Sequence, residues 1–422
     1  MTVVSALPVR FRWGIAWMLC AGTALNFIAR TNIAFVLTEV SKEFEITATA
    51  AGFLLAAFFG GYIVFNLVGG WSADRFGPRL TLGVSLLCCG LATGVSAGVR
   101  SASALFVARG LVGAASGPVF PTCAQVVTRW FPVQERGRAT AVFDVGSYIG
   151  SALAGPLVVG ATLIAGWRGA LLVCAGLLLL WPIGWFLVYP GERRKEATVV
   201  VQNTSPGTSD VWSRLLSDRK VWGMAYGFFC YNYVKVFYLS WLPTFLLHKA
   251  LTSKAMAFAS ALPPLSAIMG ELAAGAATDR LLQRGFSVTR ARKIPLCLGF
   301  LLSTVMVLAG VADSPAWAVA WLMIGYTAII SASPGIWAIP GDVSPTPEAV
   351  GRLGGLQNAV ANVGSLLSPI VTGYLWTAYH SFLPALLLSA AIAASGAFAY
   401  WVIVGELEPI GVRRGTALHH RR

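Results

Sequence analysis

Apolar residues gather in twelve runs of about 20 residues each, separated by short polar segments. A run of that length crosses a bilayer as an α-helix, because each residue rises about 1.5 Å and the hydrocarbon core is about 30 Å thick. A longer polar segment, residues 190–220, divides six runs from six. The pattern predicts an all-α membrane protein with twelve transmembrane helices, near residues 13–36, 50–73, 79–98, 103–127, 138–163, 167–189, 221–246, 256–281, 292–312, 315–338, 351–378 and 381–404.

The composition agrees with a chain embedded in a membrane. Of its 422 residues, 56% are hydrophobic and 11% are charged, whereas soluble domains are about 25% charged. This excludes a soluble enzyme, and apolar runs rich in Phe and Trp exclude disorder. The net charge of +14 does not indicate nucleic acid as a partner, because the basic residues are spread over short loops. The Cys and His residues show no metal-ligand spacing, so neither a metal nor another cofactor is expected.

The distribution of Lys and Arg predicts the orientation. If the N-terminus is cytoplasmic, 23 of the 31 Lys and Arg residues lie in cytoplasmic loops, tails and the linker, and only 5 lie outside. Positive residues favour the cytoplasmic side of a membrane. We therefore expect a multi-pass protein of the cell inner membrane, surrounded by the lipid bilayer, with both termini cytoplasmic.

The two sets of runs repeat each other. A motif that closes the second run returns at the end of the eighth, and a second motif of the fifth run returns in the eleventh: Gly70-x-x-x-Asp74-Arg75 with Gly275-x-x-x-Asp279-Arg280, and Asp144…Gly150-Ser151 with Asn358…Gly364-Ser365. Repeats of this kind build transporters whose substrate site lies between the repeats. We expect an N-terminal half at 1–189, a cytoplasmic linker at 190–220 and a C-terminal half with a cytoplasmic tail at 221–422.

The first motif carries a resemblance to a known family. Residues 70–79 follow the pattern Gly-x-x-x-Asp-Arg/Lys-x-Gly-x-Arg/Lys, which resembles the loop signature of the major facilitator superfamily. Within it, the chain looks most like the anion:cation symporter branch, which includes sugar-acid and phthalate permeases and relatives of the sialic acid and vesicular glutamate carriers. The matching stretches are 26–32, 61–62, 130–137, 228–233, 241–244 and 368–373.

The resemblance implies the major facilitator fold, two six-helix pseudo-repeats, and an inner gate. Coupling and gating roles fall on charged residues of the two motif copies, namely Asp74, Arg75, Arg79, Asp279 and Arg280. Two positions depart from the branch, where acids implicated in proton coupling often stand. This chain has Ala29 before the first-run Arg and Ser116 in the fourth run, which puts the usual proton route in doubt.

Ionisable groups inside the runs point to the substrate. An ionisable side chain within a span is costly and is a functional candidate by default. Arg30 and Lys235 lie roughly 20–25 Å from the inner ends of their helices, and Arg109 lies roughly 9 Å from its outer end. Three cations at similar depth predict an electropositive cavity for a carboxylate or a sulfonate, which an Arg fork binds through two hydrogen bonds.

Each of these assignments has an alternative. Arg30 matches the substrate Arg of the branch but could bond backbone carbonyls, and Arg109 could extend outward to the membrane surface. Lys235 matches no motif of the branch. Other polar groups near mid-span could orient the substrate or simply pack between helices: Tyr62, Tyr148, Tyr231, Asn358 and Asn362.

Two acids, Asp144 and Glu271, lie roughly 9–12 Å above the inner ends of the fifth and eighth helices. Those helices face each other across the half-to-half interface in this superfamily. Two neighbouring carboxylates do not ionise together cheaply, so one of them could bind a proton. The alternative is that each is a gate group bonded to a nearby Arg or to the backbone.

The favoured function is secondary transport. We expect a protein that imports a small organic anion by alternating access, with that anion and a co-transported H⁺ or Na⁺ as its partners, and we expect a monomer. A drug or metabolite exporter of the same superfamily is the alternative, since Gly155-Pro156 partly fits an exporter signature. A membrane enzyme or non-transporting sensor has less support, because no HExxH, G-x-S-x-G or Walker motif is present. The sequence leaves open which anion and which co-ion are carried.

Overall fold

The computed structural model describes residues 9–190, 215–344 and 347–410. All regular elements in these residues are helices. The predicted linker falls mostly on residues 191–214, and the predicted tails fall on 1–8 and 411–422, so these parts lie outside the described residues.

The first group of helices precedes the linker. It comprises α1 (Val9–Phe35), α2 (Leu37–Glu43), α3 (Ala48–Phe76), α4 (Pro78–Gly98), α5 (Ala102–Ser116), α6 (Val119–Trp130) and α7 (Val133–Val188). The 56-residue α7 is two helices joined at Gly166, whose φ of 68° is a left-handed conformation that glycine adopts without strain.

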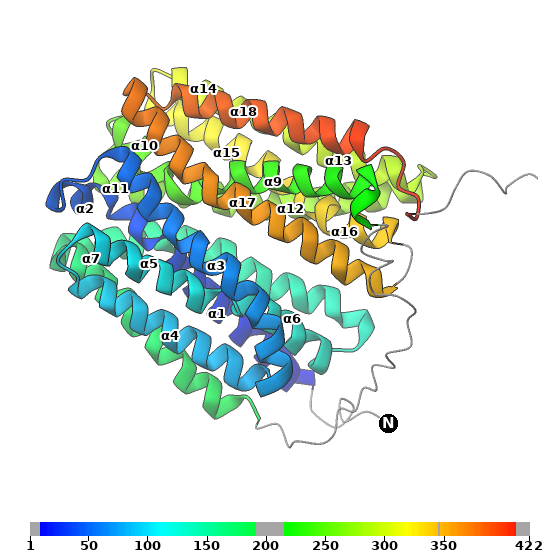
Figure 1. Cartoon of the computed structure of the whole chain (residues 1–422), viewed down its shortest axis with the longest axis horizontal. Coiled ribbons are helices and arrows are strands. Elements are labelled where there is room, and N and C mark those ends of the chain that lie inside the picture. The colour runs from blue at the N-terminus through cyan, green and yellow to red at the C-terminus, as the bar shows by residue number, and fades with distance from the viewer. Residues whose placement is uncertain (1–8, 191–214, 345–346, 411–422) are drawn as a thin grey trace, which may run out of the picture.

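The second group follows the linker. It comprises α9 (Arg219–Ser240), α10 (Leu242–His248), α11 (Ser253–Ala259), α12 (Leu262–Gln283), α13 (Val288–Ser303), η2 (Thr304–Met306), α14 (Val307–Val311), α15 (Pro315–Ser331), α16 (Ser333–Val343), α17 (Pro347–Tyr379), α18 (Leu383–Phe398) and η3 (Ala399–Ile403). Figure 1 shows this group, coloured from green to red, alongside the first.

The predicted all-α membrane fold is confirmed. In the described part of the chain, nine helices are long and apolar enough to cross a membrane, and the bent pair α1–α2 makes a tenth. One of the nine covers residues 134–188 and breaks at Gly166 into two spans. The remaining span is α9, whose tyrosines, Asn232 and Lys235 lower its hydropathy. The total of twelve matches the apolar runs of the sequence.

The internal repeat extends to individual helix ends. The number of residues from Asp74 to Asp279 is also the number from each end of α2 to the corresponding end of α10. The same spacing separates the start of α3 from the start of α11. Helices α3 and α11 open with the same cap, because Thr47 accepts a hydrogen bond from the amide of Ala50, and Thr252 from that of Ala255. The two halves therefore share one register over this stretch.

The two ends of the bundle differ. We call the end that holds Gly77, Tyr189 and Arg219 the linker end, and the end that holds α2, α10 and α11 the far end (Figure 1). At the far end, the hydroxyls of Thr49 on α3 and Thr377 on α17 lie 2.9 Å apart. At the centre, the hydroxyl of Tyr148 on α7 donates a hydrogen bond to Glu271 on α12. The groups thus meet at the far end and at the centre.

Glycines permit the close approach at the far end. A Cβ added to Gly52 on α3 would lie 2.5 Å from the carbonyl oxygen of Pro369, and one added to Gly373 on α17 would lie 2.4 Å from that of Ala48. Real side chains do not tolerate such contacts. Small residues at these two positions therefore let α3 and α17 pack backbone to backbone, as helices in membranes often do.

Candidate substrate site between the two helix groups

Arg30 occupies the middle of the interface, on α1. Its guanidinium carbon lies 4.8–5.1 Å from the centroids of four aromatic rings, those of Phe27, Phe58, Phe59 and Tyr62. Cations are attracted to ring faces, although less strongly than to an anion. The buried Nε has no hydrogen-bond partner, and no ion pair or donated hydrogen bond of this side chain occurs in the described residues. Arg30 is therefore a positive group held by aromatic rings with its hydrogen-bonding capacity unused.

Arg109 on α5 has a different setting. Its side chain is 2% exposed, and its guanidinium donates hydrogen bonds to the backbone carbonyls of Ala29 and Arg30 and to Oδ1 of Asn32, at 2.9–3.1 Å. The guanidinium is thus directed to the backbone of α1 and not outward to the membrane surface, which was the alternative raised for Arg109. Arg109 holds the stretch of α1 that carries Arg30.

Lys235 faces Arg30 from the other helix group. It lies on α9, with Nζ 5.7 Å from the centroid of the Tyr231 ring. The charges of Asp144, Arg30 and Glu271 all act on it. No hydrogen bond or ion pair of its ammonium group is found among the described residues, so Lys235 is also free to bind an anion.

The two acids belong to the same cluster as the cations. Glu271 on α12 accepts a hydrogen bond from the hydroxyl of Tyr148 on α7, at 2.7 Å. Asp144 lies one helical turn before Tyr148, close enough to Glu271 and Lys235 for their charges to act on it. Helical rise predicted separate layers of cations and acids. In the structure, α12 packs against α7, and the charges of both acids act on Lys235.

The remaining predicted substrate residues differ in their burial and in their hydrogen bonds. The Tyr62 hydroxyl accepts a weak hydrogen bond from Asn66, at 3.3 Å, and Tyr231 is buried close enough to Glu271 and Asp144 for their charges to act on it. On α17, the Asn362 amide donates to the Asn358 backbone carbonyl at 2.9 Å, and so is bonded within its own helix. The Asn358 side chain is half-buried and makes no hydrogen bond in the described residues.

Sequence reasoning missed several neighbours of the cluster. Tyr326 on α15 is 1% exposed and is close enough to Arg30 and Glu271 for their charges to act on it. The rings of Phe27, Phe58 and Phe59 were also missed, because an apolar residue in an apolar run carries no signal of its own. A tyrosine in the middle of a span is a weak signal, and it could have pointed to Tyr326.

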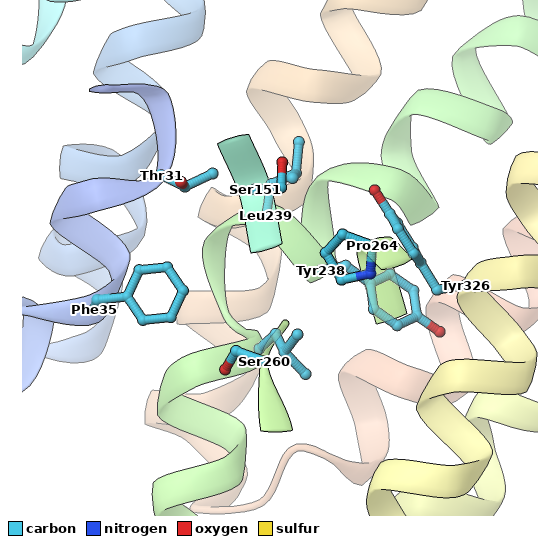
Figure 2. Close-up of a pocket in the computed structure, with 9 residues that line it drawn as sticks. Thr31, Phe35, Ser151, Tyr238, Leu239, Ser260, Pro264 and Tyr326 are labelled. Atoms are coloured by element: carbon cyan, nitrogen blue, oxygen red, sulfur yellow. The ribbon is translucent and has the colours of Figure 1, made fainter. Parts of the chain in front are cut away.

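A small cavity of about 20 Å³ lies between the cluster and the far end. Thr31, Phe35 and Ser151 line it from the first group, and Tyr238, Ser260 and Tyr326 are among the residues that line it from the second (Figure 2). This volume holds about one water molecule. The interface is therefore nearly closed on the far side of the cluster.

The predicted gating residues lie at the linker end. The amide of Gln125 on α6 donates to Asp74, and Arg79 donates to the backbone carbonyl of Phe186 at 2.6 Å. Arg75 packs against Trp71 and Phe76. These bonds connect α3 and α4 to α6 and α7, all within the first group.

In the second group, the charged residues of the motif copy are exposed and their side chains have fewer bonds than those of the first copy. Asp279 and Arg280 are exposed, and neither makes a hydrogen bond or ion pair in the described residues. Instead, Arg292 on α13 pairs with Asp342 on α16, with Nε and Oδ2 3.1 Å apart. This pair links two helices of the second group at the linker end.

Cofactor or metal ligands do not gather anywhere in the described residues, since no three His, Cys, Asp or Glu side chains are close enough to share an ion. Two groups of helices related by a repeat, with an unpaired cation from each group at their interface, define a membrane transporter.

Comparison with known proteins identifies the family. The sequence pattern of the Major Facilitator Superfamily matches residues 19–346, and the chain belongs to this family. Its curated relatives are transporters, which makes this protein a transporter and not an enzyme.

Several relatives span nearly the whole chain. A D-galactonate transporter of Escherichia coli is 29% identical, over 97% of this chain and 99% of its own. A hexuronate transporter of Bacillus subtilis is 28% identical, over 95% and 96%. A "probable sulfoacetate transporter" of Cupriavidus necator is 28% identical, over 93% of each chain.

The fold also has solved counterparts. A bacterial homologue of the human lysosomal transporter Spinster, solved in an inward-facing and occupied conformation, superposes with a TM-score of 0.77. It is 16% identical in sequence, and the match covers 94% of this chain and 97% of that one. At this level of identity the likeness establishes the shared fold.

Proposed function

We propose that this protein imports a small organic anion, a carboxylate or a sulfonate, across the cytoplasmic membrane by alternating access. One observation carries the proposal. The Arg30 guanidinium lies at the interface of the two helix groups, and no anionic or hydrogen-bonding partner for it exists in the described residues. A charge in that position is expensive unless a ligand pairs with it. The names of the relatives, which carry sugar acids and sulfoacetate, support the same class of substrate.

The orientation follows from charge. With the linker end in the cytoplasm, the bias of Lys and Arg obeys the positive-inside rule. The far end then faces outward, and its close contacts correspond to an outer gate that is shut. In this proposal, residues 1–189 and 221–422 are the two halves that rock against each other around the cluster, residues 190–220 link them in the cytoplasm, and the carrier works as a monomer.

Charge balance supports coupling to a cation. The cluster holds two formal positive charges, on Arg30 and Lys235, and two formal negative charges, on Asp144 and Glu271. A bound anion adds negative charge in a medium of low polarity, and one proton on Asp144 or Glu271 for each added charge restores the balance. H⁺ is therefore the first co-ion to test. Na⁺ would restore the balance equally well, and the two are separated by imposing each gradient alone.

The exporter alternative has no comparable support. Its sequence motif, Gly155-Pro156, lies where α7 meets α11. A Cβ added to Gly155 would be 2.5 Å from the backbone oxygen of Ala257, so close packing at the far end explains this glycine.

Uptake into proteoliposomes tests the proposal. Labelled D-galactonate and sulfoacetate are offered to purified protein reconstituted in liposomes, under an inward pH gradient, an Na⁺ gradient or neither. We expect uptake of at least one anion. Arg30→Ala and Arg30→Lys should both abolish it, because Lys lacks the planar fork that binds a carboxylate in two places.

Arg100→Ala is the matched control, since Arg100 is exposed between α4 and α5, away from the cluster. It should transport like the wild type. Normal uptake by Arg30→Ala would remove the basis of the proposal.

A further inference from the structure

Arg30 and Lys235 occupy equivalent places in the two halves. The interval between them along the chain is the one that separates Asp74 from Asp279 and α2 from α10. Each cation lies five residues before the end of its helix, since α1 ends at Phe35 and α9 ends at Ser240. Five residues of helix measure about 7.5 Å. Both cations therefore lie at the same distance from the far end, one on each side of the interface.

Both cations also lack a partner. Within the described residues, neither side chain donates a hydrogen bond or forms an ion pair; four aromatic rings lie around Arg30 and one lies beside Lys235. They are close enough for the charge of Arg30 to act on Lys235. By contrast, Arg109, the third cation of the interior, uses its guanidinium on the backbone of α1. Two free positive charges thus face one site.

We propose that the substrate is a dianion with an acidic group at each end, one bound by Arg30 and the other by Lys235. This inference rests on the proposed function and narrows its substrate class. A monoanion bound by Arg30 alone leaves Lys235 without an ion pair, with only the charges of Asp144 and Glu271 acting on it from nearby. A dianion pairs with both cations and joins the two helix groups through the ligand. Binding energy then favours the conformation in which both halves close on the site, which is what a carrier needs to move its cargo.

Matched ligand pairs test the inference. Calorimetric titration of the purified full-length protein in nanodiscs compares D-glucarate with D-gluconate, and sulfoacetate with sulfoacetamide. Each pair differs by one acidic group. We expect the dianion to bind at least tenfold more tightly than its partner in one or both pairs, which corresponds to about 1.4 kcal/mol.

Variants of Lys235 identify the second cation. Lys235→Met nearly keeps the length of the side chain and removes its charge, so it should reduce the dianion preference, which is the ratio of the two affinities within a pair, to about onefold. Lys235→Arg should keep the preference, which separates loss of charge from loss of folding. Lys254→Met, an exposed lysine on α11, is the control and should behave as wild type.

The outcomes are distinguishable. Equal affinity for both members of each pair, or a Lys235→Met variant that keeps the preference, would overturn the dianion inference and leave organic-anion transport intact. Absence of both binding and uptake for all four compounds and for D-galactonate would overturn the proposed function and the inference with it.

Discussion

Gly373 offers the sharpest test of the closed far end. A Cβ at this position would lie 2.4 Å from the carbonyl oxygen of Ala48 and 3.2 Å from Cα of Gly52, both on α3 of the other helix group. Gly373→Ala therefore requires α3 and α17 to separate by about 1 Å before ordinary contact is restored. Overpacking of this kind costs about 1–3 kcal/mol. Since about 1.4 kcal/mol is a factor of ten, the closed far end should lose roughly fivefold to over a hundredfold in population.

Distances between the two groups report this shift. Spin labels at Ser103, where α5 begins, and at Asp313, between α14 and α15, place one probe on each group at the far end. Both positions are exposed, and the labels are introduced as cysteines in a background without the seven native ones. Electron–electron resonance should show a longer distance becoming dominant in Gly373→Ala, together with slower transport.

Gly355→Ala is the control on the same helix, because a Cβ at Gly355 meets nothing within 4 Å. Its distance distribution should match the wild type. An unchanged distribution in Gly373→Ala would refute the reasoning that close backbone packing of α3 and α17 closes the far end.

Three further predictions concern the gate, the coupling acids and the support of α1. Asp74→Asn removes the charge that faces Gln125, and it should slow transport more than it weakens binding to the purified protein; equal losses would argue against gating. Glu271→Gln should retain exchange of substrate in proteoliposomes yet lose accumulation driven by a pH gradient, and full pH-driven accumulation in the Asp144→Asn, Glu271→Gln double variant would eliminate proton coupling through these acids. Arg109→Gln cannot span the carbonyls of Ala29 and Arg30, so the Kd for substrate should rise roughly tenfold or more, as expected for losing charged hydrogen bonds; an unchanged Kd in calorimetry would show that Arg109 does not position Arg30.

Much of the fold was accessible from the sequence because membrane burial requires long apolar runs and satisfied backbone groups. The two motif copies around Asp74 and Asp279 also anticipated the shared register that the structure shows at α2 and α10. The span at 221–246 was predicted too, although tyrosines and Lys235 make α9 more polar than its neighbours. Its polar residues are tolerated because most of α9 is buried within the protein.

The candidate site was less accessible, because its geometry depends on contacts between distant helices. Sequence singled out Arg30, Lys235 and Glu271 as charges in apolar surroundings. The sequence could not show that Arg109 donates hydrogen bonds to backbone carbonyls of α1, because every residue has a backbone carbonyl and the sequence does not distinguish the ones that accept. Depth estimated from helix length also could not show that the charge of Asp144 acts on Lys235, because the two residues lie on different helices.

Equilibrium binding by the purified protein tests the central claim, that a small organic anion binds at the interface through Arg30. Calorimetry with D-galactonate, D-glucarate and sulfoacetate should show saturable binding of at least one anion, with one molecule bound per chain. Breaking a buried charge pair costs about 2 kcal/mol or more, so Arg30→Ala should weaken this binding at least about 30-fold while the variant keeps the thermal unfolding transition of a folded protein. Wild-type affinity in a folded Arg30→Ala variant would contradict the account.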